Sequence, residues 1–189
     1  VDTGRQWDSL LWDSVAQFYP WRLLLHRAAR AGELPLWNPY QFSGYPFVGN
    51  GQSALFYPPN WLYFVAHPRV GLGLSAALHY FLGAFFVFGL ARTLGLRRCS
   101  ALFGAVAFTF GGFMVTWIEL PTLVNSLVWL PLGWWGIEVL RRGRPARGLV
   151  MLASALGLTL LAGHLQIAAY VWLFTGVYAL AALLARPRP

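Results

Sequence analysis

Long apolar stretches, each bounded by arginine, dominate the chain after residue 69. The first, residues 70–91, carries no Asp, Glu or Arg and is long enough for one membrane-spanning helix, which needs about 20 apolar residues. The second, residues 99–140, is too long for one crossing, and Glu119 and Pro121 interrupt it near its centre. This pattern predicts spans at 70–91, 99–117 and 122–140.

The third apolar stretch, residues 148–185, must also turn back on itself. As one helix it would extend about 55 Å at about 1.5 Å per residue, whereas the hydrocarbon core of a bilayer is about 30 Å thick. The segment AGHLQ, Ala162–Gln166, is the polar place where it can turn. We therefore predict spans at 148–163 and 165–185, which brings the total to five.

The first 69 residues have a different pattern. Leu11, Val15 and Phe18 recur at helical spacing, which favours an amphipathic helix lying in the membrane interface. Pro20 is expected to interrupt it, giving a helix pair. Arg22, His26 and Arg30 form a polar stripe at helical spacing after Pro20. From Leu34 onward the sequence is rich in Pro, Gly and aromatic residues and has no period, as is typical of a long loop that binds or covers something.

These patterns together predict an all-α integral membrane protein. Residues 1–69 form an extracytoplasmic loop with interfacial amphipathic helices, and residues 70–189 form a transmembrane helical bundle. Composition agrees, since hydrophobic residues make up 58% of the 189 residues and charged ones only 11%, against about a quarter in soluble domains. The lipid bilayer is therefore the first partner that we predict.

The arginines indicate the orientation of the bundle. The net charge of +8 comes from 14 Arg without Lys, and nine of these lie in RTLGLRR, RRGRPAR and the tail RPRP. Five crossings place all three segments on one side, which the positive-inside rule makes cytoplasmic. The loop of residues 1–69 and the turns at Glu119 and His164 then face the outer side of the membrane. Topology accounts for the arginines, so we expect no nucleic-acid partner, and RRGRPAR is expected to attract anionic lipid.

The chain opens on polar sequence without Met, so we expect it to be a fragment of a longer protein, with a span before residue 1. The single cysteine, Cys99, excludes an internal disulfide and argues against a cysteine-based metal site.

Four blocks, DSVAQFYPW, GELPLWNPYQFSGYP, NGQSALFYPPNWL and AGHLQIAAY, resemble those of YfhO-type bacterial membrane proteins, which belong to the GT-C superfamily of integral-membrane glycosyltransferases. The resemblance implies a multi-helix bundle in the bacterial plasma membrane and a catalytic Asp in the first outer loop. It also implies a polyprenyl-phosphate sugar donor and an envelope glycan or lipid as acceptor. Asp13, Gln17 and Pro20 match the family's Asp-x-x-x-Gln-x-x-Pro pattern.

Sugar transfer from such a donor needs a base for the acceptor hydroxyl and groups that stabilise the leaving phosphate. Asp13 is the predicted base. A divalent cation is an alternative source of phosphate stabilisation. The candidate substrate-binding residues are Gln17, Arg22, Asn38, Gln52, Glu119, His164 and Gln166.

Other interpretations stay open. Asp13 can be a solvated polar residue or helix cap, and Glu119 and His164 can belong to polar hairpin turns. His79 and Asn125 can each bond a neighbouring helix. A transporter or flippase of lipid-linked saccharides would place charged residues near the midplane and show internal repeats, neither of which is seen here. A non-catalytic envelope assembly protein is the third alternative.

Overall fold

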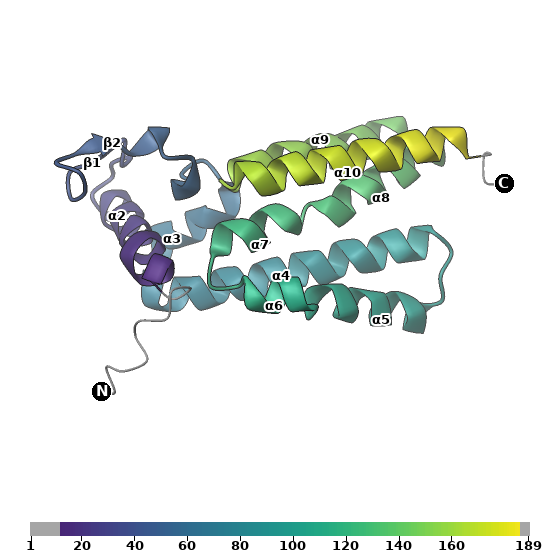
Figure 1. The fold of residues 1–189 in the computed structure, drawn as a ribbon, viewed down its shortest axis with the longest axis horizontal. Coiled ribbons are helices and arrows are strands. Elements are labelled where there is room, and N and C mark those ends of the chain that lie inside the picture. Colours follow the sequence, from purple (N-terminus) through teal and green to yellow (C-terminus); the bar gives the residue numbers. More distant parts are fainter. Residues whose placement is uncertain (1–11, 186–189) are drawn as a thin grey trace.

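The long helices from residue 68 onward run back and forth and form a bundle. The described residues before them, 12–67, cover one end of the bundle, and we call them the head (Figure 1). The computed structural model describes residues 12–185. Four helical segments are long and apolar enough to cross a membrane: Pro68–Thr93, Arg98–Thr116, Pro121–Arg141 and Leu165–Leu184. The chain is therefore mostly helical and suited to a multi-pass membrane protein, in agreement with four of the predicted spans.

The four crossing segments differ in whether their helix is continuous. Two of the crossing segments are single helices, α4 (Pro68–Thr93) and α10 (Leu165–Leu184). The other two are each divided, into α5 (Arg98–Thr109) and α6 (Gly112–Thr116), and into α7 (Pro121–Leu127) and α8 (Leu130–Arg141). Pro131 lies in the first turn of α8, where the missing N–H breaks the helical ladder and separates α8 from α7.

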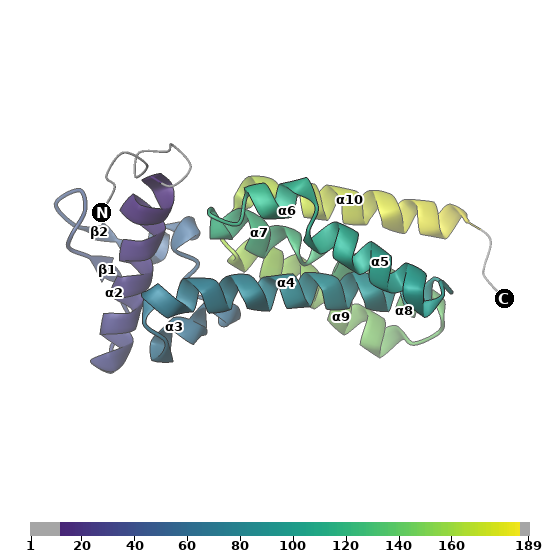
Figure 2. The ribbon, with the colours of Figure 1, turned by 90° about the horizontal axis from the view of Figure 1, so that it is seen from below.

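The fifth predicted span, 148–163, falls on the apolar helix α9 (Pro145–Leu161). Its 17 residues extend about 25 Å at about 1.5 Å per residue, which is the lower limit for a crossing. The α4–α5 and α8–α9 turns lie at the end of the bundle away from the head, whereas the α6–α7 and α9–α10 turns lie near the head (Figures 1 and 2).

Near the start of the described residues, a π-helical turn, η2 (Ser14–Phe18), passes directly into α2 (Tyr19–Arg30). The predicted break near Pro20 is therefore wrong, because the helix changes type there without ending. The Tyr19 N–H donates to the carbonyl of Ser14, five residues back. The carbonyl of Ala16, which Pro20 cannot serve, accepts a hydrogen bond from Gln41 Nε2 at 3.4 Å.

Helix α2 lies across the end of the bundle, as Figure 2 shows. Its buried face carries Trp21, Arg22, Leu25 and His26, so two members of the polar series Arg22, His26 and Arg30 point into the protein. The predicted apolar stripe is not one face either, because Val15 is 65% exposed while Phe18 is buried, and Leu11 lies outside the described residues.

The segment after α2 corrects the all-α prediction, because it contains a two-stranded antiparallel hairpin. Strand β1 (Trp37–Asn38) pairs with β2 (Tyr45–Pro46), with Trp37 opposite Pro46. Gly44 closes the hairpin at φ +100°, and a Cβ there would meet the Trp37 indole at 2.8 Å. The chain then makes a series of short helical turns, which are η3 (Phe47–Gly49), η4 (Gly51–Ser53), η5 (Pro58–Trp61) and α3 (Leu62–Val65).

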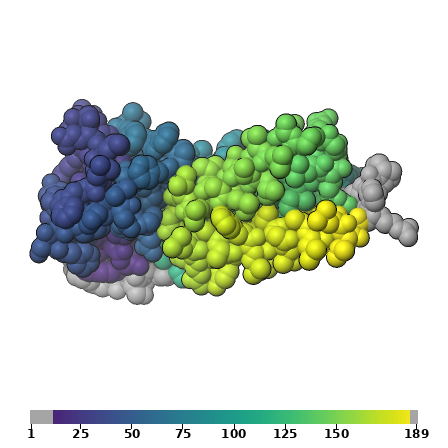
Figure 3. Space-filling view, turned by 90° about the horizontal axis from the view of Figure 1, so that it is seen from above, coloured from purple at the N-terminus to yellow at the C-terminus, as the bar shows by residue number. Residues whose placement is uncertain are grey.

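One hydrophobic core joins the head to the bundle. Tyr57 of the head is fully buried in it together with Phe86 of α4, Val128 and Trp129, which lie between α7 and α8, and Ala162. The space-filling view shows the head residues as one mass against the ends of the helices (Figure 3). The head is thus packed on the bundle through shared core residues, which positions its polar side chains.

Candidate functional site

A cavity of about 190 Å³ lies where the head meets the bundle, and we call it the junction cavity. It is bounded by η2, by the part of α4 nearest the head and by the segment from Ile118 into α7. Most of the residues that line it are apolar, and a few are polar. They are Ser14, Phe18, Leu72, Ser75, Ala76, Ile118, Glu119, Pro121, Val124 and Asn125.

Asp13 and Glu119 are held on adjoining segments at this cavity. The Ser14 hydroxyl donates a hydrogen bond to the backbone carbonyl of Glu119, which ties η2 to the α6–α7 turn. Asp13 immediately precedes Ser14, is partly exposed, and accepts a hydrogen bond from Gln17 Nε2 at 3.0 Å. The one-turn spacing of Asp13 and Gln17 allows this bond, which orients the carboxylate.

A network of buried hydrogen bonds lies beneath the junction cavity. The Tyr57 hydroxyl lies 2.8 Å from Nε2 of His79 and accepts from Trp129 Nε1 at 2.9 Å. Nδ1 of His79 lies 2.7 Å from the Ser75 carbonyl, so a ring with its proton on Nδ1 satisfies both sides. His79 thus bonds a turn of the head and its own helix, whereas one interpretation of the sequence had it bond a neighbouring helix.

Asn125 links this network to the cavity. Its carbonyl accepts a hydrogen bond from the Tyr57 hydroxyl at 3.3 Å, and Asn125 is among the residues that line the cavity. Asn125 is buried, yet its Nδ2 has no hydrogen-bond partner within residues 12–185. Buried amide donors are normally paired, so this group is available to an acceptor in the cavity. Sequence reasoning treated Asn125 as a residue that bonds a neighbouring helix.

Arg22 is buried next to this region and does not line the junction cavity. It is 1% exposed, its Nη1 donates to the Ser53 carbonyl, and its guanidinium lies 5.3 Å from the centre of the Tyr63 ring. Nε and Nη2 make no well-formed hydrogen bond in the described part of the chain. Burial lowers the pKa of Arg22 and raises the pKa of Tyr63, although their mutual interaction opposes both shifts.

A second cavity, of about 340 Å³, lies between the head and the α9–α10 turn, and we call it the turn cavity. It brings together three predicted residues, Gln52, His164 and Gln166, with Asn50 beside them. The two backbones touch at its edge, because Gly163 has φ +94° and a Cβ there would lie 2.4 Å from the Gly51 carbonyl oxygen.

His164 and Gln166 are also engaged in local contacts. Nδ1 of His164 accepts from the Ile167 N–H at 3.3 Å and so caps α10. Burial lowers the pKa of His164, while a hydrogen bond to its own backbone acts in the opposite direction. Gln166 Nε2 donates to the Tyr170 hydroxyl at 2.8 Å.

The predicted site residues therefore divide between separate places. Glu119, with the Asp13–Gln17 pair beside it, belongs to the junction cavity, and Gln52, His164 and Gln166 belong to the turn cavity; no residue lines both. Asn38 is 3% exposed and its amide bonds Gln41 Oε1 at 3.2 Å within the hairpin. Arg22 is enclosed by the protein.

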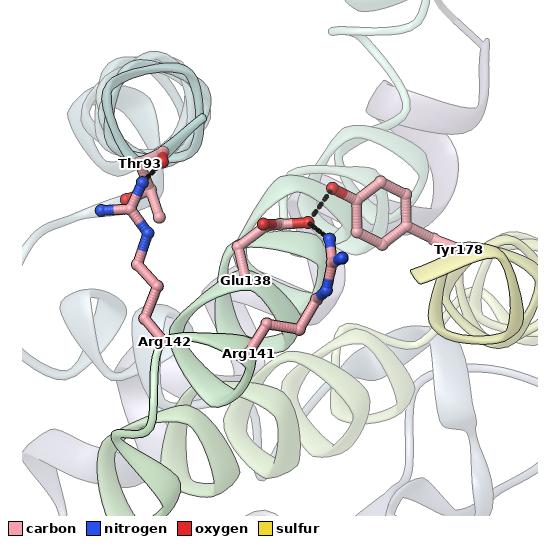
Figure 4. Close-up of polar contacts among 5 residues, drawn as sticks. All are labelled: Thr93, Glu138, Arg141, Arg142 and Tyr178. Carbon is pink, nitrogen blue, oxygen red and sulfur yellow. Dashed lines mark hydrogen bonds and ion pairs between the residues drawn. The ribbon is translucent and has the colours of Figure 1, made fainter. Parts of the chain in front are cut away.

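Sequence reasoning also missed Glu138, an acid inside the apolar stretch 122–140. It is 3% exposed, and its Oε1 accepts from Arg141 Nη1 at 3.2 Å and from the Tyr178 hydroxyl at 2.8 Å (Figure 4). An acid within a predicted span is costly unless it is paired, so its position was itself the signal. This pair lies near the end of α8, at the end of the bundle away from the head.

Residues 12–185 contain no group of three or more His, Cys, Asp or Glu side chains that could hold a metal ion. The polar residues that line the junction cavity are Glu119, Ser14, Ser75 and Asn125. Comparison with protein-family models, with curated proteins and with solved structures found no match to this chain.

Proposed function

We propose that the chain belongs to a membrane glycosyltransferase that moves a sugar from a polyprenyl-phosphate-linked donor to an envelope glycan or lipid. The observation that carries the proposal is the junction cavity, where the segments bearing Asp13 and Glu119 meet at one end of a lipid-suited bundle. The resemblance to YfhO-type proteins supplies the donor class.

The surroundings of the cavity suit a donor with a polar head and an apolar chain. Its walls are apolar apart from a few polar groups, and the α4 side chains that line it, Leu72 and Ala76, are only partly buried. A polyprenyl chain can therefore remain in contact with α4 and the bilayer while its phosphate and sugar lie at the cavity. Asn125 Nδ2 is the free donor for a phosphate or sugar oxygen.

The chemistry assigned to these residues is general-base catalysis. Asp13, oriented by Gln17, accepts the proton of the acceptor hydroxyl while that oxygen bonds to the anomeric carbon of the sugar. The bond from the anomeric carbon to the phosphate oxygen breaks, and the electron pair leaves with the phosphate. Donors such as the Asn125 amide stabilise the charge that develops there.

The proposal includes an orientation. The arginine-rich α4–α5 and α8–α9 turns lie at the end opposite the head, and we place that end in the cytoplasm by the positive-inside rule. With α9 as a fifth crossing, the head and the α6–α7 and α9–α10 turns face the outer side of a bacterial plasma membrane. A lipid-linked donor suits that side, because nucleotide sugars are cytoplasmic.

The test is transfer of labelled sugar from polyprenyl-phosphate hexose to an envelope lipid or glycan fraction, with the chain, or the longer protein that contains it, in vesicles. Asp13→Asn should lower the rate about 100-fold or more, the usual contribution of a general base. Glu33→Gln, which removes an exposed carboxylate from the end of α2, should leave transfer unchanged. Wild-type transfer by a normally inserted Asp13→Asn protein would refute Asp13 as the base, and transbilayer movement of donor without transfer would favour a flippase.

A further inference from the structure

A third cavity, of about 200 Å³, lies at the end of the bundle away from the head, and we call it the arginine cavity. It is formed where α4 ends, α8 ends and α9 begins. Its lining combines three arginines with a hydroxyl and two apolar side chains: Thr93, Trp135, Val139, Arg142, Arg144 and Arg147. The volume is several times the roughly 30 Å³ that one water molecule occupies in the liquid.

The charge at this cavity is not neutralised by the described part of the protein. No Asp or Glu lines it. Glu138, the acid of α8, is buried and engaged by Arg141 and Tyr178. Figure 4 shows that Arg141 turns toward Tyr178 of α10, whereas Arg142 reaches in another direction to the Thr93 carbonyl of α4. Of the other acids in residues 12–185, Asp13 and Glu33 belong to the head and Glu119 to the turn beside it.

The position of two of these arginines is electrostatically unfavourable in the free protein. Arg144 is the N-cap of α9 and Arg147 lies in its first turn, which contains no acidic residue. The N-terminus of a helix carries partial positive charge, which favours anions and disfavours cations. Three arginines beside such a terminus therefore repel one another and the helix, and a bound anion would relieve that repulsion.

We infer that the arginine cavity binds a phosphate group. Arginine presents its N–H donors in a planar fork that matches two phosphate oxygens, and basic pockets between membrane helices bind phospholipid headgroups. The apolar Trp135 and Val139 side chains border the cavity, so the phosphate can be that of an anionic phospholipid whose chains lie along the bundle. A free phosphate ion shares the same chemistry. The site is independent of the proposed glycosyl transfer, because its residues lie at the opposite end of the bundle.

The experiment measures thermal unfolding of the detergent-purified chain against three probes: short-chain phosphatidic acid, short-chain phosphatidylcholine and inorganic phosphate. Phosphatidic acid should raise the Tm in a saturable way, since a ligand that binds only the folded state stabilises it. The double variant Arg144→Gln/Arg147→Gln should weaken its binding at least 10-fold. The matched control, Arg27→Gln/Arg30→Gln, removes the same charge from exposed positions of α2 and should bind as wild type.

The probes separate the two sources of phosphate. Stabilisation by phosphatidic acid alone identifies a lipid headgroup, and equal, variant-sensitive stabilisation by inorganic phosphate identifies a free anion. Without ligand, the double variant should unfold at or above the wild-type Tm, because like-charge repulsion is removed. The single variant Arg144→Gln changes only an exposed N-cap residue, so it should also fold, and its affinity for phosphatidic acid provides a second test. Equal affinity of phosphatidic acid for wild type and both double variants, or stabilisation by phosphatidylcholine to the same extent, would overturn the site.

Discussion

The hydroxyl of Tyr57 lies 2.8 Å from Nε2 of His79, which joins a turn of the head to the interior of the first long helix. Trp129 Nε1 donates to the same hydroxyl at 2.9 Å, so one oxygen connects the head, α4 and the α7–α8 junction. Burial raises the pKa of Tyr57, with the Trp129 hydrogen bond acting against it, and keeps the hydroxyl protonated. This buried phenol is therefore one of the contacts that position the head on the bundle, together with the shared hydrophobic core.

Tyr57→Phe should lower the free energy of unfolding by about 2 kcal/mol, because it removes the hydroxyl that bonds the Trp129 N–H and Nε2 of His79 while conserving the aromatic ring of residue 57. The measurement is the unfolding midpoint in detergent. Tyr40→Phe is the matched control, since Tyr40 is 74% exposed and should change the free energy by less than about 0.5 kcal/mol. Equal effects of the two substitutions would show that the buried bonds contribute little.

Glu138→Ala should destabilise the bundle by about 3 kcal/mol, because it leaves the partly buried Arg141 guanidinium and the Tyr178 hydroxyl without the carboxylate. Tyr178→Phe should cost less, about 1 kcal/mol, since it removes one hydrogen bond. A double-mutant cycle of these two substitutions should give a non-additive free energy of unfolding, as is usual for residues in contact. Additivity would contradict the geometry in Figure 4.

Gly163→Ala should separate the α9–α10 turn from the head, because the added Cβ would lie 2.4 Å from the Gly51 carbonyl oxygen. Gly143→Ala is the control, since Gly143 also has a positive φ, +72°, but no atom within 4 Å of its Cβ position. Both substitutions carry backbone strain of about 1–3 kcal/mol, and only Gly163→Ala adds a clash of similar size. The difference in unfolding free energy between them measures the contact of the two backbones.

The turn cavity should loosen on acidification. Burial lowers the pKa of His164, so the neutral ring stabilises the fold fully above its unfolded pKa of about 6.5, and this contribution is lost as the pH falls toward the folded pKa. Protonation of Nδ1 also removes the acceptor for the Ile167 N–H. His164→Asn keeps a capping acceptor without a titrating group and should flatten the dependence of Tm on pH between 7.5 and 5. An unchanged pH profile would exclude His164 as its source.

Membrane topology can be tested with the single cysteine. Cys99 is exposed at the start of α5, at the proposed cytoplasmic end. A membrane-impermeant maleimide should label it only after the cells are opened. Tyr40→Cys in a Cys99→Ser background should label in intact cells, because Tyr40 is exposed in the head. The reverse pattern would place the head in the cytoplasm, and the proposed lipid-linked donor mechanism would fail with it.

The positions of the long helices could be predicted because the bilayer imposes them. A crossing needs about 20 apolar residues whatever its neighbours are, and Arg92, Arg98 and Arg141 mark where such runs end. The hairpin in the head could not be predicted in the same way. Its strands have two residues each and its turn places Phe42 and Ser43 at positive φ, so it shows no period.

Periodicity also predicted that Arg22 and His26 share a face of a helix, and they do. It could not say which environment the face meets, because spacing is identical for a face that meets water, lipid or protein. The face is covered by Tyr63, whose ring lies under Arg22 and whose carbonyl lies 2.9 Å from Nδ1 of His26. Two members of the polar stripe, Arg22 and His26, are thus part of the interior of the head.

Local hydropathy and charge were sufficient to predict where the long helices lie, which of them suit a membrane, and which turns carry arginine. Only the tertiary structure decided which polar residues meet. Ser14 bonds Glu119 at the junction cavity, whereas Gln52 and His164 together line the turn cavity. Such pairs are separated by more than a hundred residues, and their meeting depends on how the helices pack, which no local pattern encodes.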